Sequence, residues 1–178
     1  YRQAGTLTAV RLNEPWFDAG TVESLLEASN FMQDWNDPRS LPESLGKMLS
    51  LPLKHDDRGD LIVAEADKHV PFPIRRVFMI MNVQEHGNRG HHAHKTTDVV
   101  LVALRGSTLV KLDDGQTKRE VKLNQHNQGL LVPAKVWHSM EQFTDDLVLL
   151  VLASEPFDEA DYLREYEEFQ KYIHAARL

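Results

Sequence analysis

A chain of 178 residues, 42% of them hydrophobic, has the length and composition of one ordinary globular domain with a buried core. The excess of 27 acidic over 20 basic residues gives a net charge of -7, which argues against nucleic acid or an anionic membrane surface as the main partner. The absence of cysteine excludes a disulfide framework and a thiolate site and favours the cytoplasm, and no apolar run approaches the roughly 20 residues of a membrane span.

Residues 1–48 differ in pattern from the rest of the chain. Apolar residues at helical spacing between positions 21 and 32 predict a helix, and a segment rich in Asn, Asp and Pro at 36–42 indicates a break after it. The run from Trp16 to Phe31 (about residues 1–35) resembles the C-terminal part of a glucose-1-phosphate thymidylyltransferase, but the glycine-rich nucleotide loop of that family is absent. This resemblance implies that residues 1–48 are a remnant of a preceding nucleotidyltransferase-like domain and linker, fused to the remainder in one bifunctional TDP-sugar protein.

From residue 49 to the end, short apolar segments separated by glycine and Asp-Gly turns predict β-strands. They lie at Leu61–Ala64, Arg76–Met81, His91–His94, Val99–Leu104, Thr108–Leu112, Glu120–Leu123, Leu130–Val132, Val136–Met140 and Leu147–Ala153. Short strands at such regular spacing predict an all-β fold, a sandwich or barrel of antiparallel strands, over residues 49–178, and the resemblance given below implies that it is a cupin or jelly-roll barrel. Aromatic and aliphatic residues at helical spacing from Tyr162 to Ile173 predict a C-terminal helix packed on this barrel.

Three histidines form the strongest candidate site. His92 and His94 are two residues apart and share one face of a strand, and His138 lies on a later strand, so a closed barrel would bring the three imidazoles into one cavity. Asp98 has the same parity, which gives a possible metal set of three histidines and one carboxylate that partly matches the cupin signature. Against a metal, the carboxylate is shorter than the glutamate of that signature, and Lys135 stands where the signature has glycine. His91 has the opposite parity to His92 and is expected outside the cavity.

Arg58, Arg76 and Arg89 are candidates for anchoring a diphosphate, because a guanidinium binds phosphate oxygens in a bidentate manner. Ordinary ion pairs with the many surface carboxylates explain each of them equally well.

Residues from about 49 to 178 resemble the WxcM-like cupin family of nucleotide-sugar 3,4-ketoisomerases. The resemblance lies in Asp57–Leu61, Pro71–Phe78, Arg89–Lys95, Leu112–Gly115, Gly129-Leu130, Val136–His138, Leu149–Glu155 and Asp158–Tyr162. It implies a TDP-4-keto-6-deoxyglucose substrate, catalysis without metal or cofactor, and a homodimer with exchanged strands. It further implies that His94 is the base and His92 a shuttle or electrostatic partner, while His138 and Arg58 face the substrate and Arg76 and Arg89 also bind it. The family has aromatic residues where this chain has Met79 and Met81.

The residues therefore predict a 3,4-ketoisomerase in which an imidazole moves a proton through an enediolate. The combination of Arg58 with His138 resembles the branch of the family that forms the galacto product. Two alternatives stay open at this point: a metal-dependent cupin enzyme using His92, His94, Asp98 and His138, and a non-catalytic cupin that binds a nucleotide sugar.

Overall fold

The computed structural model describes residues 21, 42–84 and 87–176. The chain divides into two compact units, residues 1–40 and Leu41–Leu178, and the following concerns the second. Its strands are β1 (Lys47–Ser50), β2 (Leu53–Asp56), β3 (Gly59–Ile62), β4 (Arg76–Met81), β5 (Arg89–His94), β6 (Val99–Arg105), β7 (Thr108–Asp113), β8 (Lys118–Leu123), β9 (Gln128–Val132), β10 (Trp137–Glu141), β11 (Val148–Ala153) and β12 (Tyr162–Leu163). The helix predicted at 21–32 lies outside the described residues.

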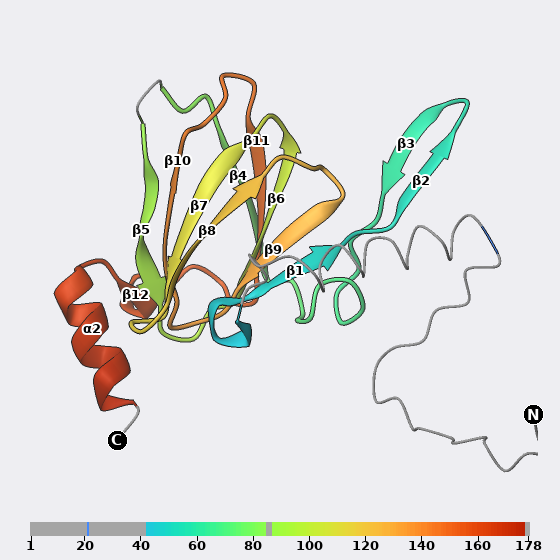
Figure 1. The fold of residues 1–178 in the computed structure, drawn as a ribbon. Coiled ribbons are helices and arrows are strands. Elements are labelled where there is room, and N and C mark those ends of the chain that lie inside the picture. The colour runs from blue at the N-terminus through green and yellow to red at the C-terminus, as the bar shows by residue number, and fades with distance from the viewer. Residues whose placement is uncertain (1–20, 22–41, 85–86, 177–178) are drawn as a thin grey trace, which may run out of the picture. The chain divides into compact units, whose positions relative to one another are not determined.

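Two five-stranded sheets form the body of this unit, with the strand orders β1-β9-β6-β11-β4 and β12-β5-β10-β7-β8 (Figure 1). All pairings within them are antiparallel. The predicted all-β barrel of antiparallel strands is confirmed, and strand β4 has the predicted bounds. Strand β1 belongs to the first sheet through its pairing with β9, so the barrel includes residues 47–50.

One hydrophobic cluster fills the space between the two sheets. It combines Leu101 of β6 and Leu149 of β11 from the first sheet with Val110 of β7 and Met140 of β10 from the second. Alternating residues of β6 point the other way, where Val100 and Val102 pack against Leu51, Val70 and Phe72. Because β6 is apolar on both faces, it is buried throughout most of its length and forms a fixed centre for the first sheet.

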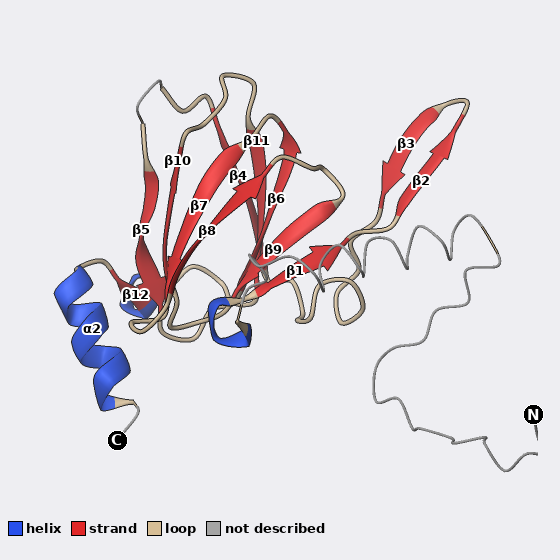
Figure 2. Ribbon diagram, viewed as in Figure 1, coloured by secondary structure: helices blue, strands red, loops and turns tan. Residues whose placement is uncertain are grey.

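The C-terminal segment differs from the predicted single helix. A short 3-10 helix, η2 (Glu159–Asp161), leads into β12, which pairs with β5, and the α-helix α2 begins only at Tyr166 and ends at Ala175 (Figure 2). The prediction of helix from Tyr162 was therefore wrong for the first residues. Their backbone groups pair with β5, whereas Phe169 and Ile173 of α2 pack on Ala93 and Leu163. Among the described residues, no helix is long and apolar enough to span a membrane.

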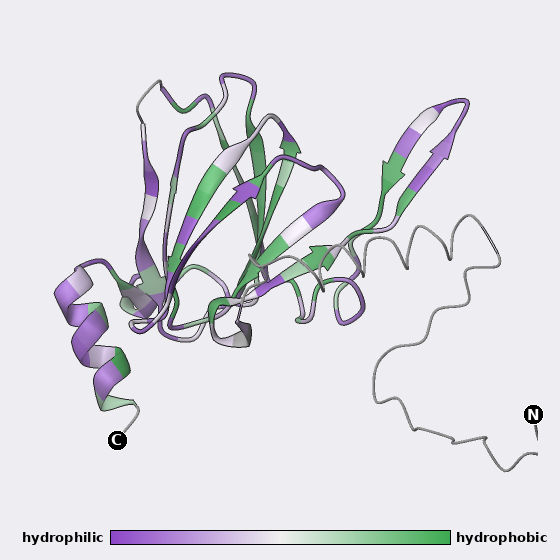
Figure 3. Cartoon of the chain, in the orientation of Figure 1, coloured by the Kyte–Doolittle hydropathy of each residue, from purple (hydrophilic) through white to green (hydrophobic). Residues whose placement is uncertain are grey.

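Strands β2 and β3 form a separate two-stranded hairpin that extends away from both sheets (Figure 1). Its residues are exposed except for Ile62, which is half-buried. Apolar residues lie at the base of the hairpin and polar ones towards its tip (Figure 3), and Leu53 and Leu61 are 42% and 58% exposed. A two-stranded hairpin of this kind is at best marginally stable alone.

Candidate active site

A cavity of about 530 Å³ opens at one end of the space between the sheets and contains the three predicted histidines. Apolar side chains of β4, β6, β10 and β11 contribute to its lining, together with polar side chains of β5 and β10 and of the residues around β12. The described lining residues are Phe78, Ile80, Asn88, Arg89, Gly90, His91, His92, His94, Val99, Leu101, His138, Met140, Val151, Tyr162 and Arg164. An apolar cavity with a few converging polar groups is the usual form of a small-molecule site.

The antiparallel pairing of β5 with β10 brings His92 and His138 together. The two residues are direct partners in the register, and their ring centroids lie 4.6 Å apart. The register then shifts so that Ser139 faces Gly90, which leaves His91 as the extra residue of a β-bulge. Gly90 has φ +83°, and a Cβ there would lie 2.8 Å from the His138 carbonyl oxygen, so the close approach of the two strands requires glycine.

His94 is held by a buried carboxylate. Its Nδ1 lies 2.9 Å from Oδ2 of Asp161, and Oδ2 also accepts a hydrogen bond of 2.6 Å from the hydroxyl of Thr97. The other oxygen, Oδ1, accepts from the backbone N–H and the hydroxyl of Thr96, both at 2.7 Å. Because an ionised carboxylate can only accept, Nδ1 of His94 must carry the proton, and its Nε2 has a free lone pair.

Burial sets the protonation state of the cluster. It lowers the pKa of His92 from 6.5 to about 4, and it lowers the pKa of His138 well below that ordinary value. Burial also lowers the pKa of His94, although the hydrogen bond with Asp161 opposes this effect. For Asp161 itself, burial would raise the pKa, but the hydrogen bonds from Thr97, Thr96 and His94 outweigh it and lower the pKa to about 2. At neutral pH the three imidazoles are therefore neutral and Asp161 is an anion.

Tyr162 completes the polar part of the cavity. Its ring centroid lies 4.4 Å from that of His94 and 5.0 Å from that of His92. The guanidinium of Arg164 stacks over the Tyr162 ring at 4.3 Å from the centroid and is itself fixed by two hydrogen bonds of 2.7 and 2.9 Å to Glu159.

The three predicted arginines lie in different places. Arg89 lines the cavity, and Arg76 lies behind Tyr162, to whose hydroxyl its Nη1 donates a long hydrogen bond of 3.5 Å. Arg58 lies in the turn of the β2–β3 hairpin, where it is exposed and hydrogen-bonds the carboxylate of Asp56. It is not among the described residues that line the cavity of its own chain.

Two expectations about the neighbours of the histidines were wrong. Asp98 does not line the cavity; its Oδ1 accepts a hydrogen bond of 2.7 Å from the backbone N–H of Ala134, and so it fixes the loop before β10. The predicted set of three histidines and one carboxylate is not assembled, and the described residues contain no group of three or more His, Cys, Asp or Glu arranged to hold a metal. His91, expected outside, is exposed but does line the cavity, because the bulge changes the alternation of side chains along β5.

Sequence reasoning missed Asp161, Tyr162 and Arg164 as site residues, because the predicted helix assigned them to scaffold. The short run Asp158–Tyr162, one of the segments that carries the family resemblance, was the available signal.

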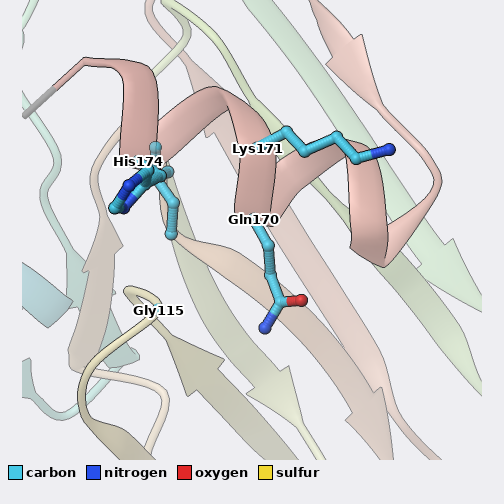
Figure 4. Close-up of a pocket in the computed structure, with 5 residues that line it drawn as sticks. Gly115, Gln170, Lys171 and His174 are labelled. Atoms are coloured by element: carbon cyan, nitrogen blue, oxygen red, sulfur yellow. The ribbon is translucent and has the colours of Figure 1, made fainter.

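A shallow depression lies elsewhere, between the β7–β8 turn and α2. Gly115, Gln170, Lys171, Ile173 and His174 line it, and the side chain of Lys171 extends away from the turn (Figure 4). Its polar side chains do not converge on a common point, so the histidine cavity is the better candidate for chemistry.

Comparison with known proteins agrees with this geometry. The family described as "FdtA: WxcM-like, C-terminal" matches residues 45–174. The TDP-4-oxo-6-deoxy-alpha-D-glucose-3,4-oxoisomerase of Aneurinibacillus thermoaerophilus is 47% identical over 118 residues, which cover 66% of this chain and 85% of that protein. One similar solved structure is a 3,4-ketoisomerase from Helicobacter canadensis, with a TM-score of 0.70 and 38% identity over 72% of this chain and 96% of that one. Another is the sugar 3,4-ketoisomerase QdtA from Thermoanaerobacterium thermosaccharolyticum in complex with TDP, with a TM-score of 0.71 and 35% identity over 74% of this chain and 96% of that one.

Proposed function

We propose, from the premise that this chain belongs to the FdtA, WxcM-like C-terminal family, that it is a sugar-nucleotide 3,4-ketoisomerase. Its substrate is a TDP-linked 4-keto-6-deoxyhexose, TDP-4-keto-6-deoxyglucose, and its product the TDP-3-keto-6-deoxyhexose. The observation that carries the proposal is a neutral imidazole, His94, fixed by the Asp161 anion in a cavity with two further neutral imidazoles. Residues 49–178 form the ketoisomerase domain.

His94 acts as the general base. The C4 carbonyl acidifies the C3 proton, and the lone pair on Nε2 of His94 removes it, so the C3–H electron pair forms the C3=C4 bond of an enediolate. The imidazolium so formed, stabilised by Asp161 at 2.9 Å, returns its proton to C4, and the carbonyl forms at C3.

His92 moves the second proton. The reaction also requires the O3 proton to leave and O4 to gain one, and a neutral imidazole can accept one proton while donating another. The His92 ring lies 5.0 Å from that of His94, and its pKa of about 4 keeps it neutral at physiological pH. His138 faces the same part of the sugar, 4.6 Å from His92. Arg89, which lines the cavity, supplies positive charge for the diphosphate end of the substrate, whereas Arg76 contacts the Tyr162 hydroxyl and is not among the described lining residues.

The position of His138 supports a galacto product. C4 receives its proton on one face of the planar enediolate, and the residues that orient the sugar decide which face lies towards the proton donor. His138 is buried and neutral, so it can position or relay a proton where a permanently charged arginine could not. A small coupling between H4 and H5 in the proton NMR spectrum of the product supports this assignment, and a large diaxial coupling contradicts it.

The protein acts as a homodimer in which the β2–β3 hairpins are exchanged. The exposed Leu53 and Leu61 of the hairpin and the exposed Val77 and Met79 of edge strand β4 are apolar surface that a second copy would cover. Exchange would bring Arg58, which is remote from its own cavity, to the cavity of the partner. Light scattering at micromolar concentration should give the mass of a dimer, and the mass of a monomer would contradict the proposal.

A mixing experiment tests the role of Arg58 in the exchange. Arg58→Ala and His94→Asn proteins are each inactive alone, but when they are unfolded and refolded together half of the dimers pair one of each, and one site in each such dimer is intact. Recovery of about a quarter of wild-type activity supports exchange. No recovery contradicts the assignment of Arg58 to the partner's cavity.

We propose, on the run Trp16–Phe31 alone, that about residues 1–35 derive from the C-terminal part of a thymidylyltransferase; the family match covers residues 45–174 and does not include them. A fused thymidylyltransferase activity in one bifunctional protein is tested by assaying the product of the whole gene for TDP-glucose synthesis. Cell fractionation tests the cytoplasmic location that the cysteine-free composition favours.

The ketoisomerase activity itself is tested with TDP-4-keto-6-deoxyglucose in deuterium oxide. We expect deuterium to enter the sugar at the exchanging carbons and a 3-keto product to form. A protein that binds the substrate but catalyses neither change would instead be a non-catalytic cupin that binds a nucleotide sugar.

A further inference from the structure

The proposed reaction places negative charge on O4 of the sugar, and the base cannot also stabilise it. A hydrogen-bond donor aimed at the developing oxyanion is the strongest single aid to such a step. The three imidazoles are neutral and engaged in moving protons. Among the described residues that line the cavity, Tyr162 carries the only hydroxyl.

The position of Tyr162 follows from the pairing of β12 with β5. Tyr162 is the direct partner of His94 in the register, so the two side chains project to the same side of the sheet. Their rings meet edge to face, with centroids 4.4 Å apart. A substrate carbon within reach of the His94 imidazole therefore lies beside the Tyr162 side chain.

Two arginines fix the phenol in this place. Nη1 of Arg76 approaches the Tyr162 oxygen at 3.5 Å, and Arg164 stacks on the ring at 4.3 Å from the centroid. Because the phenol oxygen accepts from Arg76, the hydrogen of Tyr162 points elsewhere and is available to another acceptor. Positive charge beside the oxygen strengthens the hydrogen bond that the phenol donates. Nε of Arg76 is buried and has no hydrogen-bond partner in the described part of the chain. A buried polar atom without a partner needs an explanation, and the contact of this guanidinium with Tyr162 provides one.

We propose that Tyr162 is a further catalytic residue, which donates its hydroxyl hydrogen bond to O4 of the sugar as the enediolate forms, and that Arg76 is a positioning residue that acts through Tyr162. As His94 takes the C3 proton, the C3–H electron pair becomes the C3=C4 bond and the C4=O π pair moves to O4, where Tyr162 stabilises it. No atom of Tyr162 is transferred. The inference rests on the proposed ketoisomerase function and adds to it the group that stabilises the intermediate.

The test compares Tyr162→Phe with Tyr166→Phe, its matched control. Tyr166 begins α2 and donates a hydrogen bond of 2.6 Å to Asp113, and it does not line the cavity. We expect Tyr162→Phe to lower kcat for TDP-4-keto-6-deoxyglucose by about 100- to 1,000-fold, as removal of one oxyanion donor does, with KM changed less than about threefold. Deuterium entry at C4 of the 3-keto product should fall by the same factor. Tyr166→Phe should keep kcat within about twofold of wild type.

Arg76→Met provides a second measurement, first in the wild-type background, where it does not depend on the Tyr162→Phe variant, and then combined with that variant. We expect it to lower kcat by about tenfold in the wild-type background and to have little further effect on Tyr162→Phe, because coupled residues are not additive. Full additivity would overturn the positioning role. Wild-type kcat, or a wild-type rate of deuterium entry at C4 of the product, in a folded Tyr162→Phe protein would overturn the catalytic role. A wild-type protein inactive on the substrate would overturn the proposed function and this inference together, whereas an active wild type with an active Tyr162→Phe variant overturns this inference alone.

Discussion

Replacing Asp161 by Asn should leave the fold in place but change the tautomer of His94, so that Nε2 can no longer accept the C3 proton. The carboxylate accepts four hydrogen bonds, from His94, Thr97 and two groups of Thr96. The backbone N–H of Thr96 requires an acceptor, so the Asn oxygen takes the Oδ1 position and the amide NH₂ faces His94. Nδ1 of His94 must then lose its proton and accept, and the proton moves to Nε2, where it blocks the lone pair that removes the C3 proton.

The expected loss is that of a positioned general base, about 100- to 10,000-fold in kcat, which corresponds to about 3 to 5 kcal/mol. Stability should also fall. The pKa of Asp161, lowered from 3.8 to about 2, corresponds to about 2 kcal/mol of preferential stabilisation of its ionised form, which is the upper range of the loss.

The assay is steady-state turnover of TDP-4-keto-6-deoxyglucose at a temperature where thermal unfolding shows the variant to be native. Asp98→Asn is the matched control, because Asp98 also accepts a hydrogen bond from a backbone N–H, that of Ala134, but does not line the cavity. We expect it to retain kcat within a few-fold of wild type. If folded Asp161→Asn turns over as fast as Asp98→Asn, the argument from the tautomer of His94 is wrong.

Three further predictions concern the same cluster. His94→Asn should abolish turnover while the dissociation constant for TDP, measured by calorimetry, stays within about threefold, because general-base removal affects the barrier and not diphosphate binding; wild-type turnover would reject His94 as the base. Activity should survive exhaustive chelation, since Asp98 is engaged by Ala134; loss on chelation with recovery on adding one divalent ion would restore the metal alternative. The acid limb of the pH profile of kcat should lie below pH 6.5, because burial lowers the pKa of His94. The free energy of unfolding should fall as pH drops from about 4 to about 2, because Asp161 becomes protonated in the native state over that range. A kcat limb above pH 6.5, or an unfolding free energy flat over that acidic range, would contradict these assignments.

The sequence predicted the parts of the site that depend on local alternation. His92 and His94 are two residues apart on a strand, so their shared face follows from backbone geometry alone. The bounds of β4 were likewise visible, because a continuous run of aliphatic and aromatic residues has no competing helical pattern. The cluster with His138 required only that the strands close into a barrel.

Other parts depended on contacts that local patterns do not contain. Asp98 has the parity of the histidines, but the chain leaves β5 at His94 and the alternation ends before it reaches residue 98. His91 lines the cavity because of a bulge that exists only opposite β10. Tyr162 fits a helical stripe with Tyr166 and Phe169, yet pairing with β5 satisfies its backbone and overrides that preference.

The sequence by itself thus determined an all-β barrel and the two histidines of one strand face, because period-2 alternation is a property of each strand alone. The tertiary structure decided which carboxylate holds His94. Asp161 and His94 are 67 residues apart, and only the docking of η2 and β12 against β5 brings them to 2.9 Å. A local sequence pattern cannot indicate a contact between residues so far apart. The hydrogen bonds that the Asp161 carboxylate accepts form only in the complete fold.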